Sequence, residues 1–155
     1  IADGDDTLSL WNKHGRYYHS NCYFSGYTDM VCPRGTALIE NSTFYNHQQT
    51  ATLWHDGELN PNYKLVVVNS KFDGVNGFQL GRHHYDAQFY LLNSTFSNRL
   101  ANTPIFKKRY PLDINRERPN LYGARYFFES NHTSPEIKWA KDNFRLSDVI
   151  PTTYP

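Results

Sequence analysis

The sequence predicts an all-β fold, a right-handed parallel β-helix in which each coil stacks on the next. Aromatic residues make up 16% of the chain, with 12 Tyr and 10 Phe against one Met, and such side chains fit a pleated sheet better than a crowded helix. A frame of Asn, a small residue, a variable residue and Phe recurs, each time after a strand-like run. The copies begin at Asn21, Asn41, Asn69 and Asn93, so they are 20, 28 and 24 residues apart. Recurrence at roughly 20–30 residues is typical of a solenoid.

Strands, not helices, should build each coil. The segments between the repeats contain Gly, Asn, Asp and Pro, without the ten-residue apolar periodicity of a helix. Strand-like runs precede the frames at 36–39, 65–68 and 88–92. We expect each Phe to point inward and stack on the Phe of the next coil. We expect each Asn to lie at a bend, where it tolerates a left-handed conformation.

The repeat fades after residue 96, so one domain is expected with three parts. Coils occupy residues 1–96, and 97–120 is predicted to be a long loop or irregular coil because it is rich in Arg, Lys, Pro and Asn. Residues 121–155 should add one last strand at 122–128 and a tail with a short helix near 140–144. The chain opens without a signal peptide or a capping motif. We therefore expect it to be the C-terminal portion of a longer β-helix, completed by an N-terminal fragment or a partner chain.

The charge balance argues against some classes of partner. Sixteen basic and 15 acidic residues give a formal net charge of +1, without the concentrated basic face that binds nucleic acid or anionic lipid. No apolar run approaches the roughly 20 residues that span a bilayer. Cys22 and Cys32 are too few for a disulfide scaffold, and their spacing is not that of metal ligands. They are either free side chains in neighbouring coils or one disulfide.

Two aspartates have the spacing of one solenoid turn. Asp6 and Asp29 are 23 residues apart, which would place them on adjacent coils of one face. Two such carboxylates cannot both ionise easily, so one pKa should rise and the other fall. An arginine beside one of them would keep that one charged. The pair then provides a nucleophile and a general acid.

Several short motifs occur in a recognisable order. They are Asp6-Thr7-Leu8, Gly15-Arg16-Tyr17-Tyr18, Gly26-Tyr27-Thr28-Asp29, Leu80-Gly81-Arg82, Tyr122-Gly123 and Ile137-Lys138-Trp139. This series resembles the signature of the pectin methylesterase family and covers most of the chain. The resemblance implies a parallel β-helix that hydrolyses methyl esters of galacturonate.

The resemblance also implies roles for three residues. Asp29 would be the nucleophile, Asp6 the acid and then the base, and Arg82 the group that hydrogen-bonds Asp29 and keeps it ionised. Neither a metal nor an organic cofactor is implied. The partner would be methylated pectin or a related acidic polysaccharide, and the location would be secreted, periplasmic or at the cell surface.

Substrate contacts are predicted for six further residues: Asp5, Tyr18, Trp54, His55, His84 and Tyr85. Asp5 stands where the family has an oxyanion-donating Gln, and His84 where it has a sugar-stacking Trp. Tyr18 belongs to the aromatic pair of the second motif. The rings of Trp54, His55 and Tyr85 suit a pyranose face, with packing in the core or a loop as the alternative.

Two other functions compete with ester hydrolysis. A catalytically inactive relative that only binds polysaccharide is suggested by Asp5 and by the missing Trp. A polysaccharide lyase on the same fold would need calcium, and the only acidic cluster visible for it is Asp3, Asp5 and Asp6. Methanol release distinguishes the esterase from the binding protein, and an ultraviolet-absorbing unsaturated product identifies the lyase.

Overall fold

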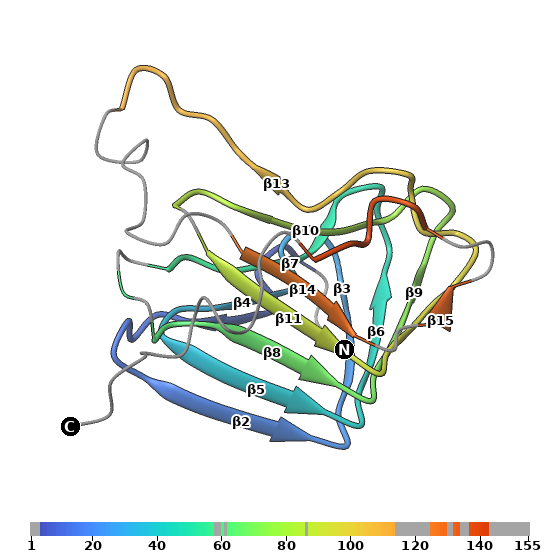
Figure 1. Cartoon of the computed structure of the whole chain (residues 1–155), viewed down its shortest axis with the longest axis horizontal. Coiled ribbons are helices and arrows are strands. Elements are labelled where there is room, and N and C mark those ends of the chain that lie inside the picture. The colour runs from blue at the N-terminus through green and yellow to red at the C-terminus, as the bar shows by residue number, and fades with distance from the viewer. Residues whose placement is uncertain are drawn as a thin grey trace.

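The chain forms a parallel β-helix of three sheets (Figure 1). The structure, a computed structural model, describes residues 4–57, 60, 62–85, 87–113, 125–129, 132–133 and 137–142. Three consecutive strands make one coil, and each coil adds one strand to every five-stranded sheet. All strand pairs are parallel. The all-β solenoid predicted from the sequence is confirmed.

The three sheets are named here by their order along a coil. Sheet 1 consists of β1 (Leu8–Leu10), β4 (Val31–Pro33), β7 (Ala51–Trp54), β10 (Gln79–His83) and β13 (Phe106–Lys107). Sheet 2 consists of β2 (Arg16–Ser20), β5 (Thr36–Glu40), β8 (Leu65–Val68), β11 (Gln88–Leu92) and β14 (Arg125–Glu129). Sheet 3 consists of β3 (Tyr23–Gly26), β6 (Thr43–Asn46), β9 (Lys71–Gly74), β12 (Thr95–Phe96) and β15 (His132–Thr133).

A ladder of phenylalanines runs through the core along sheet 3. Phe24, Phe44, Phe72 and Phe96 are register partners on successive strands. Their ring centroids are 5.0, 4.5 and 5.3 Å apart in chain order, and the rings are 8%, 0%, 1% and 2% exposed. The predicted inward stacking is confirmed. This stack fixes the pairing register of the sheet 3 strands, because a slip of one residue would turn each ring to the solvent.

The asparagines of the repeat make the bend between sheet 2 and sheet 3. Their φ angles are 57°, 51°, 50° and 46° at Asn21, Asn41, Asn69 and Asn93. Asparagine tolerates this left-handed conformation better than other side chains that carry a Cβ. The prediction of an Asn bend is therefore confirmed.

The small residue after each Asn has a role that the repeat did not reveal. Ser42, Ser70 and Ser94 each donate a hydroxyl hydrogen bond to the carbonyl two residues earlier, at 2.8, 2.8 and 3.1 Å. Each hydroxyl also accepts a backbone N–H from the preceding coil, at 3.1, 3.2 and 3.3 Å. The serines thus tie successive coils together where the bend interrupts the β ladder.

The C-terminal part departs from the prediction in two places and agrees with it in one. β13 (Phe106–Lys107) pairs with β10 inside the segment predicted as loop. The last predicted strand is present as β14 from Arg125, whereas residues 122–124 lie outside the described residues. Residues 140–142 are not helical, and 143–144 of the predicted helix are not among those described.

Both cysteines are free. No helix in the described ranges is long and apolar enough to cross a membrane.

Candidate active site

Asp6 and Asp29 occupy equivalent places on adjacent coils, at the entry to sheet 1. The register Leu8↔Val31 continues back by two residues to these aspartates. Asp6 N donates to Thr28 O at 2.9 Å, and Asp29 N donates to Ala51 O at 2.7 Å. Neighbouring strands lie about 4.8 Å apart. The prediction that the two aspartates belong to successive coils is confirmed.

Both aspartates have left-handed backbones, with φ of 51° and 52°. This conformation is uncommon for residues other than glycine, and aspartate is among those enriched in it. Gly26 allows the two coils to approach just before the second aspartate, because a Cβ there would collide with Thr7 Oγ1. The Asp-Thr-Leu and Gly-x-x-Asp motifs therefore meet across the coils.

Arg82 on β10 holds the Asp29 carboxylate from two coils away. Its Nε lies 2.9 Å from Oδ1 and 3.1 Å from Oδ2, and its Nη2 lies 2.6 Å from Oδ2. The Arg82 and Asp29 side chains are 19% and 10% exposed. This bidentate arrangement is the strong, orienting form of the carboxylate–guanidinium pair. The predicted contact between Arg82 and Asp29 is present.

The pKa of Asp29 departs from the sequence-based expectation. Burial raises it, and this effect outweighs the hydrogen bond and the charge of Arg82, which lower it. The charge of Asp6 raises it further and that of Lys108 lowers it. The pKa of Arg82 is raised, first by its hydrogen bond to Asp29. Both Oδ atoms of Asp29 accept hydrogen bonds, as an ionised carboxylate does, so the pair is ionic although burial makes Asp29 a stronger base than a free aspartate.

Asp5 is bound to the turn that precedes Asp29. The Thr28 backbone N donates to Asp5 Oδ1 at 3.2 Å. The Thr28 hydroxyl lies within hydrogen-bond distance of Thr50 Oγ1, at 3.1 Å, and of Gln48 Oε1, at 3.3 Å. Asp5 therefore positions the turn as a hydrogen-bond acceptor, and it lacks the amide donor of the glutamine that it replaces.

Beyond the ion pair, the outer face of sheet 1 carries aromatic rings and a cation. The Arg34 guanidinium carbon lies 4.2 Å from the Trp11 ring centroid and 3.7 Å from that of Trp54. His84 packs edge-on against Trp54, with 5.2 Å between centroids, and its Nε2 lies 3.0 Å from Tyr110 Oη. These contacts place the predicted substrate residue His84 beside the site.

Trp11 and Arg34 were not predicted as site residues. A sequence signal exists for both, since each follows an aspartate of the pair by five residues. Trp11 is 70% exposed, whereas Trp54 is 2% exposed. The prediction that Trp54 stacks on sugar is therefore wrong, because Arg34 covers one face of its ring and His84 contacts the ring as well.

Two other predicted substrate contacts are not supported by the structure. His55 is fully buried, with Nε2 2.8 Å from Gly35 O and burial lowering its pKa to about 4. Tyr18 lies on β2 in sheet 2 and hydrogen-bonds Glu40. The prediction for His55 is wrong because its ring is buried in the core. The contact of Tyr18, which is 62% exposed on sheet 2, stays a prediction. The predicted contact by Tyr85, whose N donates to Asp56 Oδ1 at 3.0 Å, stays a prediction.

Cys32 is a buried neighbour of the acid pair. Its Sγ lies 3.2 Å from Ser9 Oγ, on the register partner. Burial, more than the nearby charge of Asp6, raises the pKa of this thiol to about 11. The neutral thiol is a poor nucleophile, so Asp29 has no competitor there.

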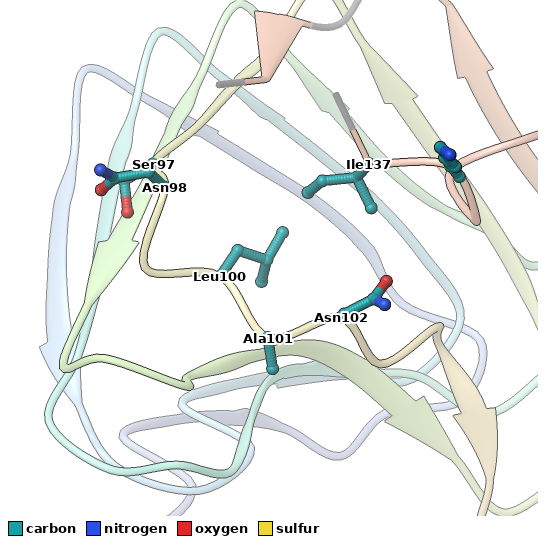
Figure 2. A pocket seen from close by; sticks show the side chains of 7 residues that line it. Ser97, Asn98, Leu100, Ala101, Asn102 and Ile137 are labelled. Atoms are coloured by element: carbon teal, nitrogen blue, oxygen red, sulfur yellow. The ribbon is translucent and has the colours of Figure 1, made fainter. Parts of the chain in front are cut away.

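A hollow of about 390 Å³ lies elsewhere, at the C-terminal end of the solenoid (Figure 2). Leu100 and Ile137 project into it and pack against the core. Lys138 is the one ionisable residue of its lining. This hollow therefore offers no acid–base pair, and the outer face of sheet 1 remains the candidate active site. The described residues contain no group of three His, Cys, Asp or Glu placed to hold a metal ion.

Comparison of the chain with protein-family models, with curated proteins and with solved structures returns no match. The geometry of Asp6, Asp29 and Arg82, together with the motifs that carry them, is the basis for a function.

Proposed function

We propose that this chain is a carboxylic ester hydrolase that removes methyl esters from galacturonate residues of pectin or a related uronate polysaccharide. The observation that carries the proposal is the Asp29 carboxylate, held at both oxygens by Arg82 with Asp6 on the adjacent coil. The ordered motifs shared with pectin methylesterases support the same reaction. An Arg82–Asp29 pair with a second aspartate on the adjacent coil suits an extended polymer that lies across the coils.

In the first step an Asp29 oxygen attacks the ester carbonyl carbon. The tetrahedral intermediate collapses to an anhydride between Asp29 and the substrate acyl group. The bond to the methoxy oxygen breaks, and Asp6 in its acid form transfers a proton to that oxygen, so methanol leaves. Burial increases the basicity of Asp29, and Arg82 orients the oxygen that attacks.

In the second step Asp6, now a carboxylate, accepts a proton from water as the water oxygen attacks the substrate carbonyl carbon. The anhydride bond to Asp29 breaks, which releases the free galacturonate acid group and restores the Asp29 carboxylate. Asp6 ends the cycle in its acid form. No further reactant is required.

Cations provide the stabilisation of the oxyanion that Asp5 cannot. Arg82 uses Nε and Nη2 on Asp29, which leaves Nη1 for another acceptor. The charge of Lys108 acts on Asp29, so it also acts on negative charge that develops beside Asp29. Such electrostatic stabilisation is worth about 3–4 kcal/mol per donor in acyl transfer.

Methanol release from methylated pectin tests the proposal. The wild-type chain and the Lys71→Met control, whose exposed side chain lies on sheet 3, should release methanol, and Asp29→Ala should not. Retention of methylated pectin without methanol would favour a binding protein. An ultraviolet-absorbing unsaturated product would establish a lyase and overturn the proposal.

A further inference from the structure

A second hollow, of about 580 Å³, lies where the chain turns from sheet 1 into sheet 2. It is called here the Arg16 hollow, and its lining consists of His14, Gly15, Arg16, Thr36, Asn62, Tyr63 and Lys64. Two of these residues are permanent cations, and the described lining contains neither Asp nor Glu. The hollow therefore combines space with positive charge.

Arg16, Thr36 and Lys64 occupy equivalent places on three successive coils. Arg16 and Thr36 are register partners at the start of β2 and β5. Lys64 immediately precedes β8, and its carbonyl accepts the Ala37 N–H at 2.9 Å. Because Ala37 and Leu65, the next residues along, belong to the core, strand alternation places the preceding side chains on the outer face. The backbones of Arg16 and Lys64 are thus about 10 Å apart, two strand spacings, with the short Thr36 between them.

The charges of Arg16 and Lys64 are not neutralised within the part of the chain that the structure describes. Neither residue belongs to the two ion pairs found there. Lys64 Nζ lies 5.5 Å from the centroid of the Tyr90 ring, and Arg16 is exposed. Two like charges on one face repel each other, so a negatively charged group between them gains from both.

The remaining lining consists of neutral hydrogen-bonding groups that tie the walls of the hollow together. His14 Nδ1 lies 2.6 Å from Tyr63 Oη, which joins the coil of β2 to that of β8. The Thr36 hydroxyl donates to Asn62 O at 3.0 Å. A water molecule takes about 30 Å³ of liquid volume, so the hollow has room for an anionic group and for the molecule that carries it.

We infer that the Arg16 hollow binds the phosphate or sulfate group of a larger molecule, as in a sugar ester. Such a group has three terminal oxygens that point in different directions, so it accepts hydrogen bonds from Arg16 and from Lys64 on opposite sides at once. The two oxygens of a carboxylate lie in one plane and suit a single guanidinium better. This binding is separate from ester hydrolysis, since neither Asp29 nor Arg82 lines the hollow.

Isothermal titration calorimetry at low salt, with glucose 6-phosphate, glucose 6-sulfate, galacturonate and glucose, tests the inference. Both esters should bind, and glucose should not. Arg16→Met and Lys64→Met should each weaken binding of the esters about tenfold, whereas the Lys71→Met control should not. Asp29→Ala should leave their affinity unchanged, which separates this site from the candidate active site. Failure of both esters to bind, an equal loss in Lys71→Met, or tighter binding of galacturonate would overturn the inference.

Inorganic phosphate distinguishes a free ion from an ester as the source of the anion. It should bind more weakly than glucose 6-phosphate, because it leaves most of the hollow unfilled; an equal affinity would overturn the claim that a larger molecule is bound. Sodium chloride should weaken binding of both esters by screening the cations, and binding independent of salt would contradict the role of Arg16 and Lys64. Arg16 is exposed, so Arg16→Met carries the test if Lys64→Met fails to fold, as judged by circular dichroism.

Discussion

The Arg82–Asp29 pair makes a quantitative prediction about stability. Arg82→Met keeps most of the side-chain stem but leaves Asp29, 10% exposed, without its cation. Breaking a buried pair by removing one partner costs about 3–5 kcal/mol, and the residual exposure of both side chains argues for the lower end, about 3 kcal/mol. Asp29→Asn should cost about 1–2 kcal/mol, because Arg82 is 19% exposed and can reach water.

The double variant separates the charge from the packing. With both changes no unpaired charge remains, so the loss should be about 2 kcal/mol, less than the sum of the single losses by about 2 kcal/mol. Urea unfolding at neutral pH measures the three variants against the wild-type chain. Arg99→Met is the control, since Arg99 and Asp73 are 52% and 41% exposed and 3.6 Å apart, and it should cost less than about 1 kcal/mol. Single losses that add within about 0.5 kcal/mol would refute the argument that a buried ion pair is present.

Three more predictions concern the solenoid. Phe44→Ala should cost about 3–5 kcal/mol in urea unfolding, because the fully buried ring stacks on both neighbours; a loss under about 1 kcal/mol would contradict the ladder. Asn69→Ala should lower stability by about 1 kcal/mol, whereas Asn69→Gly should not, because φ is +50°; equal effects would exclude backbone strain. His55 has a folded pKa of about 4 against 6.5, so the fold favours the neutral ring. The stabilisation from the neutral His55 ring is complete above pH 6.5 and falls by about 3 kcal/mol as the pH drops through 4. His55→Gln should flatten that part of the stability profile.

The repeat predicted most of the architecture. Four Asn-x-x-Phe frames were enough to expect the inward rings and the left-handed bends, because each feature depends on residue type at a fixed place in the coil. The spacing of Asp6 and Asp29 predicted that they lie on adjacent coils, since it equals the length of the coil between them. The repeat did not reveal the hydrogen bonds of Ser42, Ser70 and Ser94, which stand in the small-residue position of the frame.

The direction in which each side chain points was harder to predict than the arrangement of the strands in a coil. Trp54 and His55 follow one another on the chain, and Trp54 lies under Arg34 whereas His55 enters the core. Composition does not decide which of two neighbouring aromatic residues faces solvent, because strand alternation depends on where the bend ends. The distance in sequence between Tyr18 and Asp29 likewise does not reveal that Tyr18 belongs to sheet 2. The contacts of Arg34 with Trp11 and Trp54 join three successive coils, so they cannot be recognised before the register of those coils is known.

The pKa of Asp29 depends on the packing around its ion pair with Arg82. The sequence suggested that Arg82 would lower the pKa of its partner. Burial has the larger effect and raises it, and burial is a property of the surrounding coils. A raised pKa also predicts that ester hydrolysis declines on the acid side at a pH above that expected for an ordinary aspartate.

The most direct test of the esterase account is the initial rate of methanol release by Asp29→Asn relative to the wild-type chain. The substitution keeps the shape of the side chain and removes the attacking carboxylate. The account predicts a loss of about a thousandfold or more in a variant whose circular dichroism spectrum is unchanged. A folded Asp29→Asn variant that keeps its rate within about tenfold of wild type would show that Asp29 is not the nucleophile.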